Sequence, residues 1–447
     1  MSSNKDFTVA IVGGGIAGLV CAVGLARAGV EVDVFEAASK YEEIGAGIGI
    51  GANAMRSFEG MGILEEVKAH SQSMGTASRS FKFVRGTEPH DVIYDYPIDV
   101  DGKNGNMGAV FHRAAFLDVL SHLLPTNARS HFNKRCVSVY TDQEGRVRLR
   151  FTDDTVHEAD VVIGADGIKS VVRTQVIGED ADRLVDTGTS AYRALIPVQR
   201  LHDANIRKEF LEDLLKPSPR GYIGLDKHII TYAIMNGTML NISALTTDLA
   251  HSMVPAGPQA SWVTWVQPAT REDVLEAFKD FGPDVRAIFE CIEKPTKWAM
   301  HGLYPPLESH VFSAKSEDGG AASRINVVLV GDAAHAMLSH LGAGASVGIE
   351  GAYVLTSLLA HPQTKHANLS DVLRAYNVVR VPRAAYVANG SKRAGDIYQG
   401  HGPSGPGDKG RRKDLDLQWE PIWNYDTREE LSRAVKLLGD EGVFARE

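Results

Sequence analysis

The sequence predicts an α/β fold with a discontinuous parallel-sheet domain, an inserted, mostly antiparallel sheet domain and a C-terminal helical region. Two short β-branched strands enclose an apolar helix within the first 36 residues, which is how a doubly wound, Rossmann-like sheet begins. Strand-like runs dominate from about residue 185 to 300, and a short apolar strand follows at Arg324–Val330. Because this late strand has the composition of a buried parallel strand, we expect it to rejoin the first sheet.

The first turn of the chain is typical of a dinucleotide-binding site. The strand Thr8–Val12 is followed at once by the pattern G-x-G-x-x-G, formed by Gly13, Gly15 and Gly18. In this pattern the first glycine allows a tight turn, the second lets the backbone approach a pyrophosphate, and the third packs helix against strand. We therefore expect a dinucleotide at this turn.

The next two elements complete the expected βαβ unit. We expect an apolar helix over Leu19–Ala28, a stop at Gly29, and a strand over Val30–Phe35 that ends on Glu36. An acidic residue at this position accepts hydrogen bonds from ribose hydroxyls, so Glu36 is a candidate ribose ligand. The alternative is an ordinary βαβ turn that happens to carry a surface glutamate.

Composition favours a large cytoplasmic enzyme. The chain has 447 residues, of which 44% are apolar, enough for two packed domains. Its net charge of −9 gives no electrostatic reason to expect a nucleic-acid or anionic membrane partner. Its three cysteines, Cys21, Cys136 and Cys291, are too widely spaced for a disulfide framework or a zinc site, so we expect no metal. A basic, apolar leader and a long apolar run are both lacking, so we expect neither export nor membrane insertion.

The chain divides into four expected segments. The parallel-sheet domain is expected to comprise residues 1–184 and 301–395, the inserted sheet domain 185–300, and a C-terminal loop and helix 396–447. Expected elements of the later segments are strands at Tyr192–Val198, His228–Met235 and Leu240–Leu245, helices at Arg271–Phe281, Val347–Leu358 and Thr427–Leu438, and a loop at Gly400–Lys413. The stretch Gly45–Gly51, which includes Gly49, is so rich in glycine that we expect irregular backbone close to a ligand.

Two more junctions between a strand and a turn add to the first. A strand ends at Asp166, which begins the segment D-G-x-x-S-x-x-R over Asp166–Arg173. The strand Arg324–Val330 leads into G-D-A-A-H at Gly331–His335, and the glycine-rich segment Gly342–Ser346 follows. Each of these dipeptide turns is common by itself, so only their combination is informative.

In combination, the three segments resemble those of the single-component FAD-dependent aromatic hydroxylases, the superfamily similar to para-hydroxybenzoate hydroxylase. The looser similarities that run along the chain are greatest to salicylate hydroxylase. The resemblance implies FAD as cofactor, NADH or NADPH as reductant, and hydroxylation of a small aromatic acid by O2 through a flavin C4a-hydroperoxide. Salicylate, giving catechol and CO2, is the first expectation. A 3-hydroxybenzoate or 6-hydroxynicotinate hydroxylase, a flavin oxidase or reductase and a non-catalytic FAD-binding protein remain alternatives, and a homodimer remains open.

The resemblance also implies residue roles. The adenosine half of FAD would be held by Gly13, Gly15, Gly18 and Glu36, and its middle by Arg113. Asp166 would lie near the pyrophosphate, and Asp332 would bind the ribityl chain. The flavin ring would be lined by Gly49, Gly342, Gly344 and Ala345. Relatives usually carry proline where this chain has Ser339, a departure that affects the loop beside the flavin.

Phenol hydroxylation is favoured when a base removes the phenol proton, and histidine, with a pKa near 6.5, suits that task. His228 and Tyr232 lie four residues apart on one expected strand, so they point to the same sheet face. The resemblance places a similar His-x-x-x-Tyr at the substrate. The alternative is a half-buried histidine and a packing tyrosine. Arg193 could bind a substrate carboxylate, but a surface or interdomain ion pair is the more usual role of a lone arginine.

Overall fold

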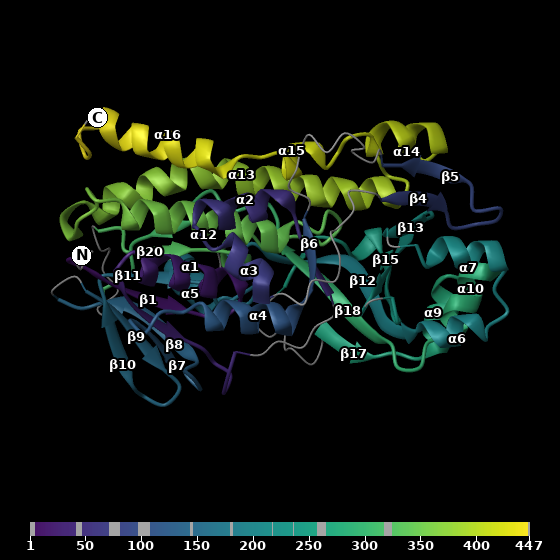
Figure 1. Ribbon diagram of the computed structural model, residues 1–447, viewed down its shortest axis with the longest axis horizontal. Helices are drawn as coiled ribbons and strands as arrows, with labels where there is room; N and C mark the ends of the chain where they lie inside the picture. Colours follow the sequence, from purple (N-terminus) through teal and green to yellow (C-terminus); the bar gives the residue numbers. More distant parts are fainter. Residues whose placement is uncertain are drawn as a thin grey trace.

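A computed structural model describes residues 5–41, 47–70, 81–96, 108–143, 146–178, 182–216, 218–235, 237–256, 265–316 and 324–445. Gly45, at the start of the expected glycine-rich loop, lies outside these residues. Figure 1 shows the parallel-sheet domain on the left, the second sheet domain on the right, and long C-terminal helices over the top.

The parallel sheet has six strands in the described chain, in the order β19-β20-β11-β1-β2-β7. Their bounds are β1 (Thr8–Val12), β2 (Glu31–Phe35), β7 (Ala128–His131), β11 (Val161–Gly164), β19 (Val311–Phe312) and β20 (Val327–Leu329). All pairings are parallel except that of β19 with β20. As expected, the late strand β20 rejoins the first sheet, so the turns after β1, β11 and β20 meet at one edge.

The two faces of this sheet are covered differently. Val9 and Ile11 face a helical layer, whereas Ala10 and Val12 face a small second sheet, as the period of two in a strand requires. The helical layer contains α1 (Ile16–Arg27), α4 (Arg113–His122) and α12 (Gly344–Ala360). The opposite layer contains β8 (Cys136–Thr141), β9 (Val147–Phe151), β10 (Val156–Ala159) and α5 (Val171–Ile177).

The second domain is built on a nine-stranded sheet of the described chain, in the order β17-β18-β12-β15-β14-β13-β4-β5, with β16 beside β12. The bounds are β4 (Lys82–Arg85), β5 (Val92–Asp95), β12 (Leu184–Pro197), β13 (Arg220–Ile223), β14 (Lys227–Ile234), β15 (Met239–Thr247), β16 (Val254–Pro255), β17 (Val266–Pro268) and β18 (Thr296–Leu303). Only the β13–β4 pairing is parallel. Strands β4 and β5 come from the range expected for the first domain, which is a difference from the sequence analysis.

Short helices cover the outer face of this sheet. They are α6 (Val198–His202), α7 (Lys208–Leu214), α9 (Arg271–Ala277) and α10 (Pro283–Glu290). The expected helix Arg271–Phe281 ends at Ala277, and a second helix starts at Pro283, where proline is favoured in the first turn.

The glycine-rich stretch forms a strand, which corrects our expectation of irregular backbone. β3 (Gly47–Ile50) pairs antiparallel with β6 (Ala109–His112). The pairing satisfies the backbone N–H and C=O groups of the strand, and Gly49 faces open space. The expectation that this backbone lies close to a ligand stays a prediction.

The remaining helices of the described chain are α2 (Ala52–Gly60), α3 (Leu64–His70), α11 (Asp332–His335), α13 (Leu369–Tyr398), α14 (Asp408–Leu415), α15 (Glu420–Trp423) and α16 (Thr427–Asp440), with 3-10 turns at Leu249–His251 and His366–Asn368. α13 extends from the parallel-sheet domain to the second sheet domain (Figure 1). The expected loop Gly400–Lys413 contains the start of α14, which is another correction. No helix among the residues described has the length and apolarity to cross a bilayer.

Candidate active site

Three glycine turns are packed directly against one another at the edge of the parallel sheet. Gly13 has a φ of +106°, and a methyl group there would lie 2.4 Å from the carbonyl oxygen of Ala165. A methyl group on Gly18 would lie 2.0 Å from the carbonyl oxygen of Gly13. One on Gly331 would lie 2.9 Å from the side chain of Ala17. The turns after β1, β11 and β20 are thus close enough to form one binding edge.

Other glycines at this edge face open space. No described atom lies within 4 Å of a methyl group placed on Gly15, Gly49 or Gly342. Gly15 caps α1 and Ala343 caps α12, and neither helix has a side-chain cap in the described chain. The N–H groups of both helix N-termini are therefore available to phosphate or ring oxygens. This combination of open backbone and unused donors fits the pyrophosphate and flavin of FAD.

Acidic residues stand beside both helix N-termini. The Glu36 carboxylate accepts hydrogen bonds from the Gly14 and Ala38 N–H groups, each at 2.8 Å. A carboxylate has about four acceptor positions, so Glu36 retains capacity for ribose hydroxyls. Asp332 is exposed at the first position of α11, and its Oδ1 lies 4.0 Å from a methyl group placed on Gly344. Both positions agree with the roles that the resemblance implies, which stay predictions.

Asp166 makes hydrogen bonds to neighbouring groups of the protein. Its buried carboxylate accepts hydrogen bonds from the Ser170 hydroxyl at 2.5 Å and from the N–H groups of Val171 and Val172 at 2.7 and 3.1 Å. Burial raises the pKa of this carboxyl, and the hydrogen bonds oppose that shift. Asp166 therefore caps α5, and a direct contact with the cofactor remains a prediction.

Arg173 joins two of the motifs. Its guanidinium is fully buried and donates to the carbonyl oxygens of Ile168 at 2.7 Å and Ala333 at 3.1 Å. It also pairs with Asp182 at 3.1 Å. The arginine of D-G-x-x-S-x-x-R thus ties the turn after β11 to the helix of G-D-A-A-H.

The residues predicted for catalysis lie on one face of the second sheet. Directly paired residues of antiparallel strands point to the same side. Arg193, Ser243 and Ile230 form one such row across β12, β15 and β14. His228 and Tyr232 lie in rows on either side of it. The sequence expectation that these two share a face agrees with this register.

Arg193 lies on this face, close to β3. The Tyr232 hydroxyl donates to the Gly47 carbonyl at 3.4 Å, which places β3 opposite the sheet. The Arg193 side chain is exposed, and desolvation by the surrounding residues lowers its pKa. Nearby Tyr232 raises that pKa and Arg113 lowers it, so all three lie within electrostatic reach.

Arg193 has no carboxylate partner in the part of the chain that the structure describes. Its guanidinium carbon lies 5.0 Å from the centre of the Trp298 ring, a cation–π contact that orients it. The alternative of an interdomain ion pair is therefore not seen among these residues. A cationic group without an acidic partner is suited to bind an anionic ligand.

His228 departs from the expectation of a base with a pKa near neutrality. The side chain is buried, and burial, with a smaller effect from His340, holds its pKa well below 6.5. Nδ1 lies 3.3 Å from Nε2 of Gln399, while Nε2 has no hydrogen-bond partner in the described chain. The pKa part of our prediction is wrong because α13 seals the ring from solvent. Because the Gln399 amide donates to Nδ1, the neutral imidazole carries its proton on the buried Nε2.

His340 is a site residue that the sequence analysis missed. Its ring lies 5.1 Å from that of His228, and its buried Nδ1 also lacks a partner among the described residues. The available indication was its position two residues before Gly342. The loop itself turns without the family proline, since the Gly342 N–H donates to the carbonyl of exposed Ser339 at 3.0 Å.

We predict that the free energy of unfolding decreases as the pH is lowered from about 6.5 to about 4. Burial lowers the pKa of His335 and of His340 to about 4, with smaller contributions from Arg380 and Lys392. In this window the unfolded chain binds protons that the folded chain excludes, so stability is complete above about pH 6.5 and is lost as the pH falls. Each histidine accounts for up to about 3 kcal/mol.

Urea unfolding of the wild-type protein at several pH values measures this decline. His340→Gln removes one titrating group and should make the decline shallower. An unchanged slope in that variant, or a wild-type stability independent of pH, would contradict the prediction.

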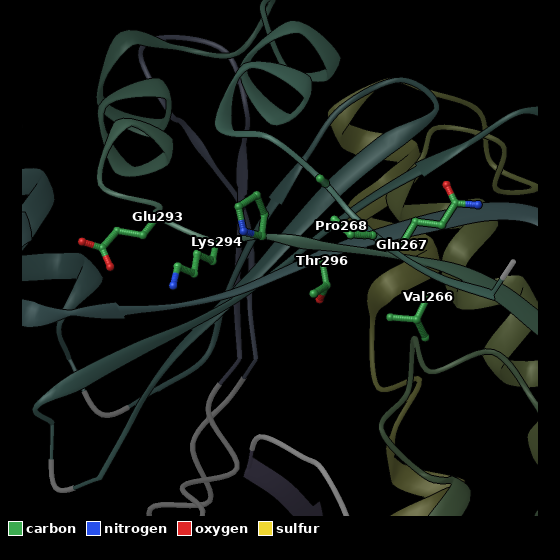
Figure 2. Close-up of a pocket in the computed structure, with 8 residues that line it drawn as sticks. Val266, Gln267, Pro268, Glu293, Lys294 and Thr296 are labelled. Carbon is green, nitrogen blue, oxygen red and sulfur yellow. The ribbon is translucent and has the colours of Figure 1, made fainter. Parts of the chain in front are cut away.

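A surface hollow lies away from this site, at the outer edge of the nine-stranded sheet. Figure 2 shows its walls, β17 and the loop before β18, with Val266 and Gln267 on the first and Glu293 and Lys294 on the second. None of the residues discussed above as site candidates lines it. The candidate active site is therefore the sheet face that carries Arg193, His228 and Tyr232, close to β3 and to the edge where the three turns meet.

Known proteins share this architecture and much of this sequence. The family described as FAD binding domain matches residues 6–198 and 307–391. A salicylate hydroxylase of Pseudomonas putida is 36% identical over 455 residues, covering 99% of this chain and 98% of that protein. A 6-methylsalicylate 1-monooxygenase of Aspergillus terreus is 31% identical, covering 98% and 94%. A solved salicylate hydroxylase substrate complex has a TM-score of 0.81 and 32% identity, over 97% of this chain and 99% of that one. The chain belongs to this FAD-binding family, as an FAD-dependent aromatic hydroxylase of the salicylate hydroxylase type.

Proposed function

We propose that this monooxygenase acts on a small phenolic acid, with salicylate as the first candidate and NADH or NADPH as the reductant. The observation that supports this most strongly is Arg193, a guanidinium without a described carboxylate partner on the sheet face beside β3. The proposed substrate recess lies between this face and β3. The relatives named above act on salicylate and 6-methylsalicylate, which agrees with an anionic aromatic substrate. Bound FAD supplies acceptance of a hydride and activation of O2.

The row of Arg193, Ser243 and Ile230 forms the floor of the proposed substrate site. Arg193 would bind the carboxylate by charge-assisted hydrogen bonds, which hold an acid in one orientation. Because the Gln399 amide donates to Nδ1 of His228, Nε2 of the neutral ring carries the proton and would donate a hydrogen bond to the phenolate oxygen, which stabilises the electron-rich, deprotonated form of the substrate ring. Tyr232, at the other end of the floor, would close the recess against Gly47 and exclude water.

The proposed reaction balances without a further reactant. Salicylate, O2, NADH and two protons give catechol, CO2, NAD+ and water. Oxygen is added at the carbon that carries the carboxylate, and the bond to that carboxylate breaks. One oxygen atom of O2 enters catechol and the other leaves as water.

The purified FAD-loaded protein mixed with salicylate and NADH should therefore release catechol and CO2 in equal amounts. Mass spectrometry of catechol made under 18O2 would show one labelled atom. Parallel reactions with 3-hydroxybenzoate and 6-hydroxynicotinate test the alternative substrates. NADH consumption that yields only H2O2 with all three acids would contradict the proposed function and favour an oxidase.

A further inference from the structure

A chain of buried polar contacts links the C-terminal helix to the glycine strand β3. Glu350 on α12 is fully buried and accepts hydrogen bonds from Arg380 at 3.2 Å and from Arg383 at 2.8 and 3.1 Å. Arg380 also pairs with Glu430 on α16 at 2.9 Å. Two arginines and two glutamates thus balance one another in a region without solvent, where a group left unpaired would be strongly unfavourable.

This network ends on the turn that follows β3. The Asn53 side-chain amide donates to Glu350 at 2.7 Å, and Asn53 is itself fully buried. A methyl group on Gly51 would lie 2.4 Å from the Asn53 side-chain oxygen, so the two groups are in direct contact. The Gly51 N–H donates to the Ser346 hydroxyl at 2.9 Å. The turn is therefore held by α12 at two points, Glu350 and Ser346.

Both attachments lie next to residues that would form the walls of the proposed flavin site. Ser346 belongs to the first turn of α12, beside Gly344, and Gly51 directly follows β3, which contains Gly49. The spacing between the α12 N-terminus and β3 is consequently fixed by Asn53 and Ser346. The C-terminal segment supports the same place, since Arg383 donates to the carbonyl oxygens of Pro421 and Ile422 at 3.1 and 3.2 Å.

We propose that Asn53 and Glu350 are positioning residues for the flavin, which set the separation of β3 from the N-terminus of α12. They act through Gly51 and Ser346 and touch no reacting atom. The inference rests on the proposed placement of the flavin between Gly49 and Gly344. A wider site would let the flavin move and admit water, so reducing equivalents would be lost as H2O2 in place of product.

Asn53→Ala tests this proposal, with Ser57→Ala as its matched control. Ser57 lies one turn further along α2, is also buried, and hydrogen-bonds the Thr427 hydroxyl at 3.0 Å and the Asn53 backbone carbonyl at 3.2 Å, but not the Asn53 side chain that reaches Glu350. For Asn53→Ala we expect FAD to dissociate about tenfold more readily, measured by flavin fluorescence on the apo-protein. We also expect the fraction of consumed NADH that ends as H2O2 to rise severalfold. Ser57→Ala should change neither quantity, although both variants lower the melting temperature.

Ser346→Ala removes the second attachment of Gly51 and should reproduce both effects, with rescue in Ser346→Thr, which keeps the hydroxyl. If Asn53→Ala does not fold, Ser346→Ala decides the question. Unchanged FAD affinity in these variants, or equal losses in Ser57→Ala, would overturn the proposal. If the wild-type protein makes no hydroxylated product from any acid, the proposed function fails, and the FAD measurement still tests the positioning of the flavin.

Discussion

Gly15→Ala is expected to prevent retention of FAD while the apo-protein stays as stable as the wild type. No described atom lies within 4 Å of a methyl group at this position, and the backbone of Gly15 is extended with a φ of −74°. The new methyl group would occupy the space that a pyrophosphate needs at the α1 N-terminus. We expect FAD affinity to fall on the order of 100-fold, equivalent to about 2.7 kcal/mol.

Gly13→Ala should behave differently, because its methyl group would collide with protein. Alanine at a φ of +106° is strained by about 1–3 kcal/mol, and the methyl group would lie 2.4 Å from the Ala165 carbonyl oxygen. The apo-protein itself should therefore lose stability. Thermal unfolding of apo-protein and FAD titration separate the two effects. Gly439→Ala in the last turn of α16, where a methyl group would meet open space, is the control. Full FAD affinity in Gly15→Ala would refute the placement of the cofactor at this turn.

Arg193→Met should raise the KM for salicylate on the order of 10- to 100-fold, because charge-assisted hydrogen bonds contribute about 1.5–3 kcal/mol. Methionine preserves much of the packing against Trp298 but removes the charge. Binding of FAD should be unaffected, and inhibition by phenol, which lacks a carboxylate, should change little. Steady-state kinetics with both ligands measure this difference.

Arg200→Met is the matched control, since Arg200 is an exposed arginine on α6 that pairs with Glu293 at 2.7 Å. It should leave the KM unchanged. An Arg193→Met enzyme with a normal KM, or equal weakening of salicylate and phenol, would show that the carboxylate is bound elsewhere.

Local structure could be predicted from the sequence where it depends on residues that are close together in the chain. Gly13, Gly15 and Gly18 follow a strand and precede a helix, so their turn could be predicted from local spacing alone. The helix α1 nevertheless starts at Ile16, three residues before the predicted Leu19, because Gly15 serves as its cap. Strand β3 was not predicted, because glycine is not favoured in strands and its partner β6 lies about 60 residues further along the chain.

Features set by tertiary packing could not be predicted. The depressed pKa of His228 results from burial under Tyr398 and Gln399, which are 170 residues distant in sequence. Strands β4 and β5 looked like part of the first domain because a strand's sequence does not specify its partner sheet. The contact between Asn53 and Glu350 joins positions 297 residues apart, and neither residue stands out in its own segment.

The long helix α13 has a consequence for how new specificities arise in this fold. At 30 residues it is about 45 Å long, and it packs on α12 at one end and on His228 and Phe83 at the other. One continuous helix therefore extends from the proposed flavin site to the proposed substrate floor. Adaptation to a larger or smaller acid must then proceed by exchanging individual side chains on the floor, with the scaffold that carries them left in place.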